Sequence, residues 1–201
     1  PWSEPLDAAR HGPTAPYQLA EFDALDLALL VGEGWIKGDD YLNLNIWTPD
    51  ETASGLPVLV FIHGGAWTGG SGAAPVHDGS AFARDGVVCV TINYRLGIDG
   101  FLPIPGAPTN LGLRDMIAAL EWIQREIAAF GGDPANVTVA GESAGAMSIA
   151  DLMVSPLAKG LFRRAIIQSG HGSMVGTAET NRKVVDKLAK MLGVPATLEG
   201  F

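Results

Sequence analysis

The stretch VTVAGESAGAMS, residues 137–148, places a serine where its hydroxyl could act as a nucleophile. Ser143 lies between Gly141 and Gly145, with a predicted strand before it and a predicted helix after it. A G-x-S-x-G sequence at a strand-to-helix turn holds the hydroxyl on a sharp bend, and its small residues let strand and helix pack closely. A serine is a poor nucleophile until a base removes its proton, so Ser143 also needs a base. The alternative is a glycine-rich turn that exposes a serine without a catalytic role.

A second glycine-rich stretch, IHGGAW at residues 62–67, follows a run of apolar residues. Acyl transfer creates an oxyanion, and preorganised backbone N–H groups in such a loop can stabilise it. An HGGG-type loop followed by G-x-S-x-G, here about 80 residues later, is far more specific than either motif alone. We expect His63 to shape the loop rather than to act in catalysis. A phosphate-binding loop is disfavoured, because the stretch lacks both G-K-[S/T] and the G-x-G-x-x-G fingerprint.

The elements that must position these two motifs alternate along the chain. An alternation of apolar and polar residues predicts a half-buried strand at residues 42–47. Apolar runs at residues 57–62 and 87–92 predict strands that are buried on both faces, and further strands are expected at residues 137–140 and 164–168. Helical spacing of apolar residues predicts helices at residues 110–130, 144–154 and 180–192. This alternation indicates right-handed crossovers onto a mostly parallel sheet, an α/β fold with helices on both faces. With so few strands, we also expect one edge of the sheet to be open.

Composition and charge exclude several classes of function. Of the 201 residues, 47% are hydrophobic and 17% are charged, which is typical of a folded globular domain. The 13 basic and 22 acidic side chains give a net charge of -9, which disfavours nucleic-acid binding because phosphates require a basic face. No apolar run is long enough to span a bilayer. The scattered histidines and the single Cys89, expected to be buried in a strand, offer no metal-ligand spacing, so we expect no metal and no cofactor.

Several stretches, in this order, resemble the type-B carboxylesterase/lipase family, the cholinesterase-like branch of the α/β-hydrolases. The similarity covers most of residues 35–172. YLNLNIWTP at residues 41–49 is similar to the family's CLYLNVWTP, and VFIHGGAWTGGSG is similar to its oxyanion loop. VTINYRLGIDGFL, the stretch 110–148 and AIIQSGH resemble later family motifs. The resemblance implies the N-terminal part of one α/β-hydrolase domain, with residues 1–40 as an irregular peripheral segment and residues 41–201 carrying the sheet, the oxyanion loop and the nucleophile elbow.

The resemblance also implies roles for individual residues. Ser143 would form an acyl-enzyme during the hydrolysis of a small-molecule carboxylic ester. The backbone N–H groups that would hold the oxyanion belong to Gly65, Ala66 and Ala144. Glu142 would be a buried support residue rather than the triad acid, and Trp67 would border the substrate gorge.

The chain departs from the family pattern in composition and in length. Tyr41 replaces the disulfide cysteine of secreted members, and the lack of a disulfide framework favours a cytoplasmic, bacterial-type member. Ala66 replaces the third loop glycine, which is compatible with the role because only its N–H is used. Family members are much longer, with the triad acid and histidine well beyond the nucleophile. We therefore expect both residues past Phe201, in a C-terminal remainder of the same protein, and a short missing stretch before Pro1.

The remaining histidines leave alternatives open. His171 directly follows a predicted strand, at the end where such sheets bind ligands. It could line the pocket near Ser143, act as its general base, or be structural or exposed. We expect His11 and His77 at the surface. Two competing interpretations are a non-catalytic α/β-hydrolase-like binding module, which retention of Ser143 disfavours, and a fragment that is inert without its C-terminal part.

Overall fold

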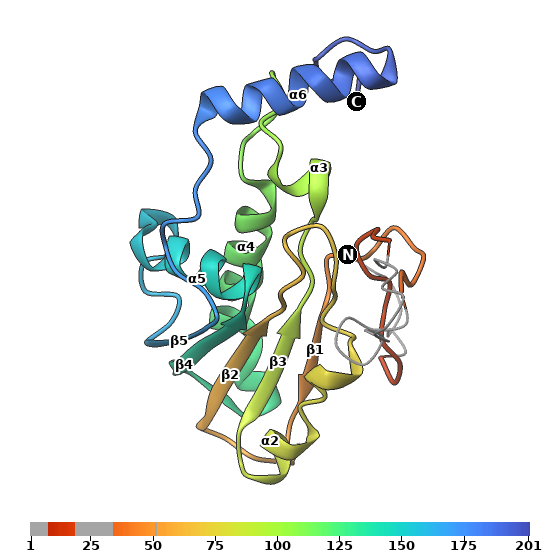
Figure 1. Cartoon of the computed structure of the whole chain (residues 1–201). Coiled ribbons are helices and arrows are strands. Elements are labelled where there is room, and N and C mark those ends of the chain that lie inside the picture. Colours follow the sequence, from red (N-terminus) through yellow and green to blue (C-terminus); the bar gives the residue numbers. More distant parts are fainter. Residues whose placement is uncertain (1–7, 19–33, 51) are drawn as a thin grey trace.

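The computed structural model describes residues 8–18, 34–50 and 52–201, and these form one sheet with helices around it (Figure 1). The strands are β1 (Leu44–Trp47), β2 (Leu56–Ile62), β3 (Val88–Ile92), β4 (Gly132–Glu142) and β5 (Arg164–Gln168). The helices are α2 (Ser80–Arg84), α3 (Gly97–Phe101), α4 (Leu111–Glu126), α5 (Ala144–Val154) and α6 (Ala178–Leu192). Single 3-10 turns are η1 (Pro75–His77), η2 (Ile127–Phe130) and η3 (Pro156–Ala158).

The strand order β1-β3-β2-β4-β5 determines which loops meet. β3, β2, β4 and β5 run parallel, and β1 pairs antiparallel with β3 at one edge. Ile62 at the end of β2 pairs with Gly141 near the end of β4. The carboxyl ends of these two strands are therefore neighbours. The glycine-rich loop after β2 and the serine turn after β4 consequently lie at the same edge of the sheet, although they are far apart in sequence.

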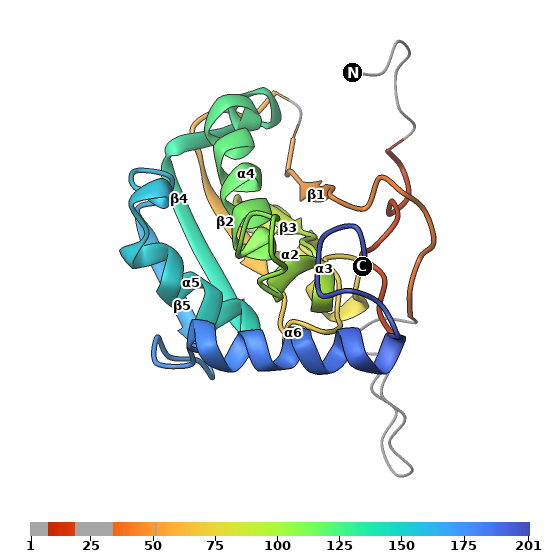
Figure 2. The same cartoon turned by 90° about the horizontal axis from the view of Figure 1, so that it is seen from above.

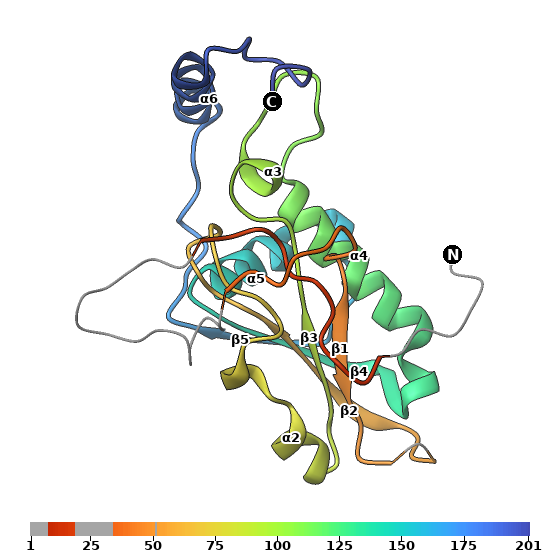
Figure 3. The same ribbon diagram turned by 90° about the vertical axis from the view of Figure 1, so that its right-hand side faces the viewer.

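Helices cover both faces of the sheet, as the sequence predicted. α4 and α5 contact each other and β4, and α2 packs on β1 and β3 from the other side (Figure 3). α6 lies beyond the carboxyl ends of the parallel strands rather than on either face of the sheet, as Figures 1 and 2 show. The α/β architecture is therefore confirmed for the described residues.

The core is formed by the central strands and α4. All five residues of β3 are buried, including Cys89, in agreement with the sequence-based expectation. The expectation that β2 is buried on both faces is wrong, because Leu59 and Phe61 are only half-buried. Their side of the sheet faces α2, which has only five residues and contacts β1 and β3.

Most predicted elements are confirmed, and their bounds differ in informative places. β5 spans the predicted residues 164–168, whereas β4 begins five residues earlier than predicted. The long predicted helix is divided into α4 and η2, and α2 and α3 were not predicted from the sequence. Residues 8–18 and 34–40 contain no helix or strand, as expected, and the rest of the predicted irregular segment lies outside the described residues. Among the described helices, none has the length and apolar character needed to cross a membrane.

A buried ion pair joins the carboxyl end of β3 to α4. The Arg95 guanidinium donates from Nε to Asp115 Oδ2 at 2.8 Å and from Nη2 to Oδ1 at 2.6 Å. The backbone N–H of Arg95 also donates to Asp115 Oδ2, at 3.0 Å. The Asp115 side chain is only 8% exposed. Since a bidentate pair of this kind also fixes orientation, it holds the start of α4 against the loop that follows β3.

We predict that Asp115→Ala lowers the free energy of unfolding by about 2–3 kcal/mol, because it leaves the partly buried Arg95 without a partner. The matched control is Glu179→Ala, since Glu179 pairs with Lys183 at 2.8 Å but both side chains are largely exposed. The control should change stability by less than about 0.5 kcal/mol. Urea denaturation of both variants measures the difference, and equal effects would contradict the assignment.

Candidate active site

Ser143 occupies a strained turn between β4 and α5. Its φ of 51° and ψ of -118° lie in a region that residues with a side chain rarely adopt. Its N–H donates to the Gln168 carbonyl at 2.9 Å, and its carbonyl accepts from the Met147 N–H at 2.9 Å. The serine is therefore held from one side by the end of β5 and from the other by the first turn of α5.

The glycines on either side of Ser143 are required by close contacts of the backbone. A Cβ added to Gly145 would overlap the carbonyl group of Ile62, the last residue of β2. A Cβ added to Gly141 would lie 2.9 Å from the same carbonyl oxygen and 2.8 Å from the carbonyl carbon of Gly145. The G-x-S-x-G spacing thus lets α5 start directly against the end of β2.

The loop after β2 forms a left-handed turn beside Ser143. Gly65, Ala66 and Trp67 have φ values of 107°, 52° and 59°, and the Gly65 carbonyl accepts from the N–H groups of Thr68 and Gly69, both at 3.0 Å. A Cβ on Gly65 would overlap the Gly69 carbonyl. Only a glycine fits that position, whereas Ala66 and Trp67 each bear a strain of about 1 kcal/mol or more.

The same loop contacts the serine turn. A Cβ on Gly64 would lie 3.2 Å from Ser143 Cβ, 2.9 Å from the Glu142 carbonyl oxygen and 2.7 Å from Glu142 Oε2. The strand order therefore brings together the two motifs that the sequence singled out. Of five non-glycine residues with positive φ in the described part of the chain, four follow β2, β4 or β5 at this edge: Ala66, Trp67, Ser143 and Ser169.

His63 is buried against the loop that follows β2 and is not available for proton transfer. It is 2% exposed and stacks on Tyr94, with ring centroids 4.4 Å apart. Its Nδ1 lies 2.7 Å from the Gly64 carbonyl oxygen, which can only accept, so the neutral ring carries its proton on Nδ1. Burial lowers the pKa of His63 from 6.5 to about 4, with a smaller opposing effect of the Gly64 carbonyl. These contacts are compatible with the expected role in shaping the loop, which stays a prediction.

Glu142 departs from its predicted environment. It was expected to be buried, but the structure leaves it exposed, because the described residues place nothing over the outer side of the turn at the end of β4. Its carboxylate instead lies against Gly64. The expected burial of Glu142 is therefore wrong for the described structure, and its support role stays a prediction.

The other histidines lie apart from Ser143 or have local partners. His171 is exposed, and its Nδ1 is 2.8 Å from Ser173 Oγ. His11 is exposed, as expected, and contacts Asn45. His77 was expected at the surface but is half-buried, with its ring 4.8 Å from that of Phe61 and Nδ1 3.1 Å from the Ser71 carbonyl oxygen. Within the described residues, no histidine forms a hydrogen bond with Ser143.

Trp67 was expected to border the gorge, and its indole is directed towards α5. Trp67 Nε1 donates to Ser148 Oγ at 3.0 Å, and its ring lies 6.0 Å from that of Phe101. No sequence motif indicated this contact of Ser148. The arrangement as a whole offers a serine on a strained turn beside a loop of backbone donors. In the described parts of the chain, no group of three or more metal-binding side chains accompanies it.

The model of the carboxylesterase family matches residues 1–199. The chain belongs to the carboxylesterase family. It is 44% identical over 198 residues to para-nitrobenzyl esterase of Bacillus subtilis, covering 96% of this chain and 39% of that protein. It is 40% identical over 205 residues to acetylcholinesterase of Gallus gallus, covering 97% of this chain and 26% of that protein.

Solved structures agree with the family assignment. A PNB esterase superimposes with a TM-score of 0.84 at 42% identity, covering 97% of this chain and 40% of that chain. The resemblance to type-B carboxylesterases and the α/β-hydrolase fold are therefore both confirmed. The chain spans less than half the length of these relatives.

We predict that Gly145→Ala destabilises the protein by roughly 3 kcal/mol or more, because the added methyl group and the Ile62 carbonyl are both on rigid backbone. The matched control is Gly172→Ala, whose Cβ would meet only Ala150 Cβ at an ordinary 3.5 Å. Thermal unfolding should show a clearly lower Tm for Gly145→Ala and little change for the control. A wild-type Tm for Gly145→Ala would refute the close-contact account.

We predict that His63 makes stability depend on pH between about 6.5 and 4. Its pKa is lower in the folded state, so in this window the unfolded chain binds more protons and stability falls as the pH falls. The full effect is on the order of 3 kcal/mol. His63→Asn keeps an N–H donor and removes this titration. The pH dependence of unfolding by urea should be steeper for the wild type than for His63→Asn; parallel curves would exclude the effect.

Proposed function

We propose that the protein is a serine esterase in which Ser143 attacks the carbonyl carbon of a carboxylic ester. The observation that carries the proposal is the contact between the strained Ser143 turn and the left-handed loop at Gly64–Trp67. Membership of the carboxylesterase family supports ester hydrolysis at the level of the family. The nucleophile and the acyl-enzyme are the finer parts of the proposal.

The donors proposed for the oxyanion are the backbone N–H groups of Gly65, Ala66 and Ala144. Within the described residues, the N–H groups of Gly65 and Ala66 donate to no protein acceptor. Ala144 opens α5, and the N–H groups in the first turn of a helix have no intrahelical partner. Three donors near one serine, preorganised by a rigid backbone, suit a negative charge that develops only during the reaction.

The proposed reaction has two halves. Ser143 Oγ bonds to the ester carbonyl carbon as its proton passes to a base, and the carbonyl oxygen becomes the oxyanion. The C–O bond to the alcohol then breaks, and the alcohol leaves with that proton. Water adds to the acyl-enzyme in the same way and releases the acid and free Ser143.

The base and the acid that orients it are proposed to lie in the remainder of a longer protein. No described histidine contacts Ser143, and the relatives are much longer than this chain. The outer edge of β5 has no partner strand among the described residues, and Ile166 and Ile167 on it are 46% and 38% exposed. We propose that this remainder covers that edge and completes a single domain. His171 remains an alternative base from this chain.

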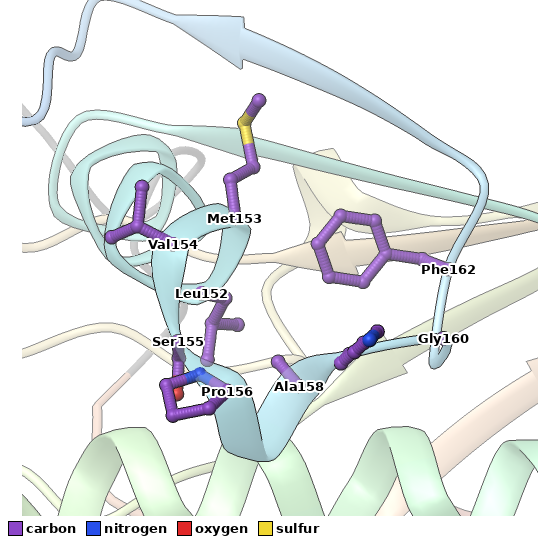
Figure 4. A pocket seen from close by; sticks show the side chains of 9 residues that line it. Leu152, Met153, Val154, Ser155, Pro156, Ala158, Gly160 and Phe162 are labelled. Carbon is purple, nitrogen blue, oxygen red and sulfur yellow. The ribbon is translucent and has the colours of Figure 1, made fainter.

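A hollow at another place on the molecule does not compete with this site. It lies at the far end of α5 and is lined by side chains of α5, η3 and the segment before β5, among them Leu152, Met153 and Phe162 (Figure 4). The eleven residues of α5 separate it from Ser143 by about 15 Å. It is open, and among the residues that line it only Ser155 and Lys159 have polar side chains.

The test is labelling of the full-length protein with a fluorophosphonate probe, followed by intact-mass measurement and peptide mapping. We predict one adduct on Ser143, and its loss in Ser143→Ala together with at least a thousandfold lower kcat, about the size expected for removing a nucleophile.

The control for this test is Ser169→Ala. Ser169 also has positive φ and follows β5 at the same edge, so its replacement disturbs a similar turn. It should leave labelling unchanged. An unlabelled wild-type protein would overturn the assignment and favour a binding module, whereas an adduct that persists in Ser143→Ala would overturn it by placing the nucleophile at another residue.

A further inference from the structure

Hydrogen bonds of its carbonyl group and of its indole hold Trp67 in an unfavourable backbone conformation. A bulky residue with φ of 59° is a rare outlier and persists only when its surroundings fix it. Its carbonyl accepts a short hydrogen bond of 2.6 Å from the N–H of Gly97, the first residue of α3. Its indole stacks obliquely on Phe101 and donates from Nε1 to Ser148 Oγ at 3.0 Å.

Ser148 connects this indole to the start of α5. It is fully buried, and its hydroxyl donates to the carbonyl of Ala144 at 2.8 Å. The hydroxyl thus accepts from the indole and donates to the helix, which satisfies both groups. In this bridge of Trp67, Ser148 and Ala144, the residues Trp67 and Ser148 are 81 positions apart in the sequence. It links the loop that carries the Gly65 and Ala66 N–H groups to the turn that carries the Ala144 N–H group.

We propose that Trp67 and Ser148 are positioning residues that set the distance between the two halves of the oxyanion site. This inference rests on the proposed function, since it assigns the bridge a role in the stabilisation of the oxyanion beside Ser143. The two halves belong to different elements, the loop after β2 and the N-terminus of α5. No other side-chain hydrogen bond joins residues 64–69 to α5 within the described chain.

The expected consequence is kinetic. Removal of the bridge lets the left-handed turn relax, so the donors of the loop no longer match an oxyanion held by Ala144. A ground-state ester makes little use of those donors, whereas the tetrahedral state depends on them. The bridge therefore acts on kcat and on the affinity for tetrahedral adducts, with little effect on KM.

The test uses the full-length protein with Trp67→Phe, Ser148→Ala and the double variant. Phenylalanine keeps a ring against Phe101 and removes only the indole donor. For a p-nitrophenyl ester, we expect each single variant to lower kcat about tenfold with KM within about twofold. The kcat of the double variant should be no lower than that of the less active single variant, because all three variants lack the same bridge.

An aryl trifluoromethyl ketone provides the second measurement. Ser143 Oγ adds to its carbonyl carbon, its proton passes to the base, and the ketone oxygen becomes an oxyanion in a stable adduct. We expect Ki for this ketone to rise by about the same factor as kcat falls. A wild-type kcat in Trp67→Phe, effects of the single variants that multiply in the double variant, or an unchanged Ki would each overturn the proposal.

The matched control is Trp122→Phe. Trp122 lies on α4 with its ring 6.0 Å from that of Phe130, the same spacing as between Trp67 and Phe101, and no described hydrogen bond involves its indole. It should retain wild-type kcat and Ki. Equal losses of kcat in both tryptophan variants would show that the effect of Trp67→Phe results from general destabilisation. Ser143→Ala separates the two proposals: full activity there overturns the proposed function, whereas an inactive Ser143→Ala with a normal Trp67→Phe overturns only the bridge.

Discussion

The candidate site depends on one close contact, that between the carbonyl of Ile62 and the backbone of Gly145. The contact exists because β2 and β4 are neighbours and because neither glycine of the serine turn has a side chain. It places the first turn of α5 directly against the last residue of β2. The loop that follows β2 starts beside the serine turn, since a Cβ on Gly64 would lie 3.2 Å from Ser143 Cβ, and the two motifs are therefore neighbours.

Backbone strain is concentrated at the same edge, and each strained residue has its own restraint. Ser143 is held by Gln168 of the neighbouring strand, Ala66 by the turn that closes on the Gly65 carbonyl, and Trp67 by Gly97 and Ser148. Local strain persists in proteins where the surrounding structure determines it. The rigid core provided by β3, the buried His63–Tyr94 stack and the Arg95–Asp115 pair gives these restraints a fixed base.

The sequence was sufficient to predict what depends on local pattern. The bounds of β5 and α5, the two glycine motifs and the α/β class all follow from apolar runs and glycine spacing. It could not predict contacts between distant residues, so the bridge from Trp67 to Ser148, the half-burial of His77 and the exposure of Glu142 were missed. The only sequence signal for the bridge from Trp67 to Ser148 was a tryptophan within a loop of glycines. Within the described residues, His171 bonds to Ser173 rather than to Ser143.

The outer edge of β5 has a consequence for the handling of the protein. Among the described residues no strand pairs with its outer side, and two of its isoleucines are substantially exposed, a combination that lets one copy add to another as an extra strand. Such addition requires no unfolding, so its rate rises with protein concentration even far below the melting temperature. Chain produced as this segment alone therefore carries a template for aggregation, and chaperones that bind extended apolar segments have a ready substrate in it.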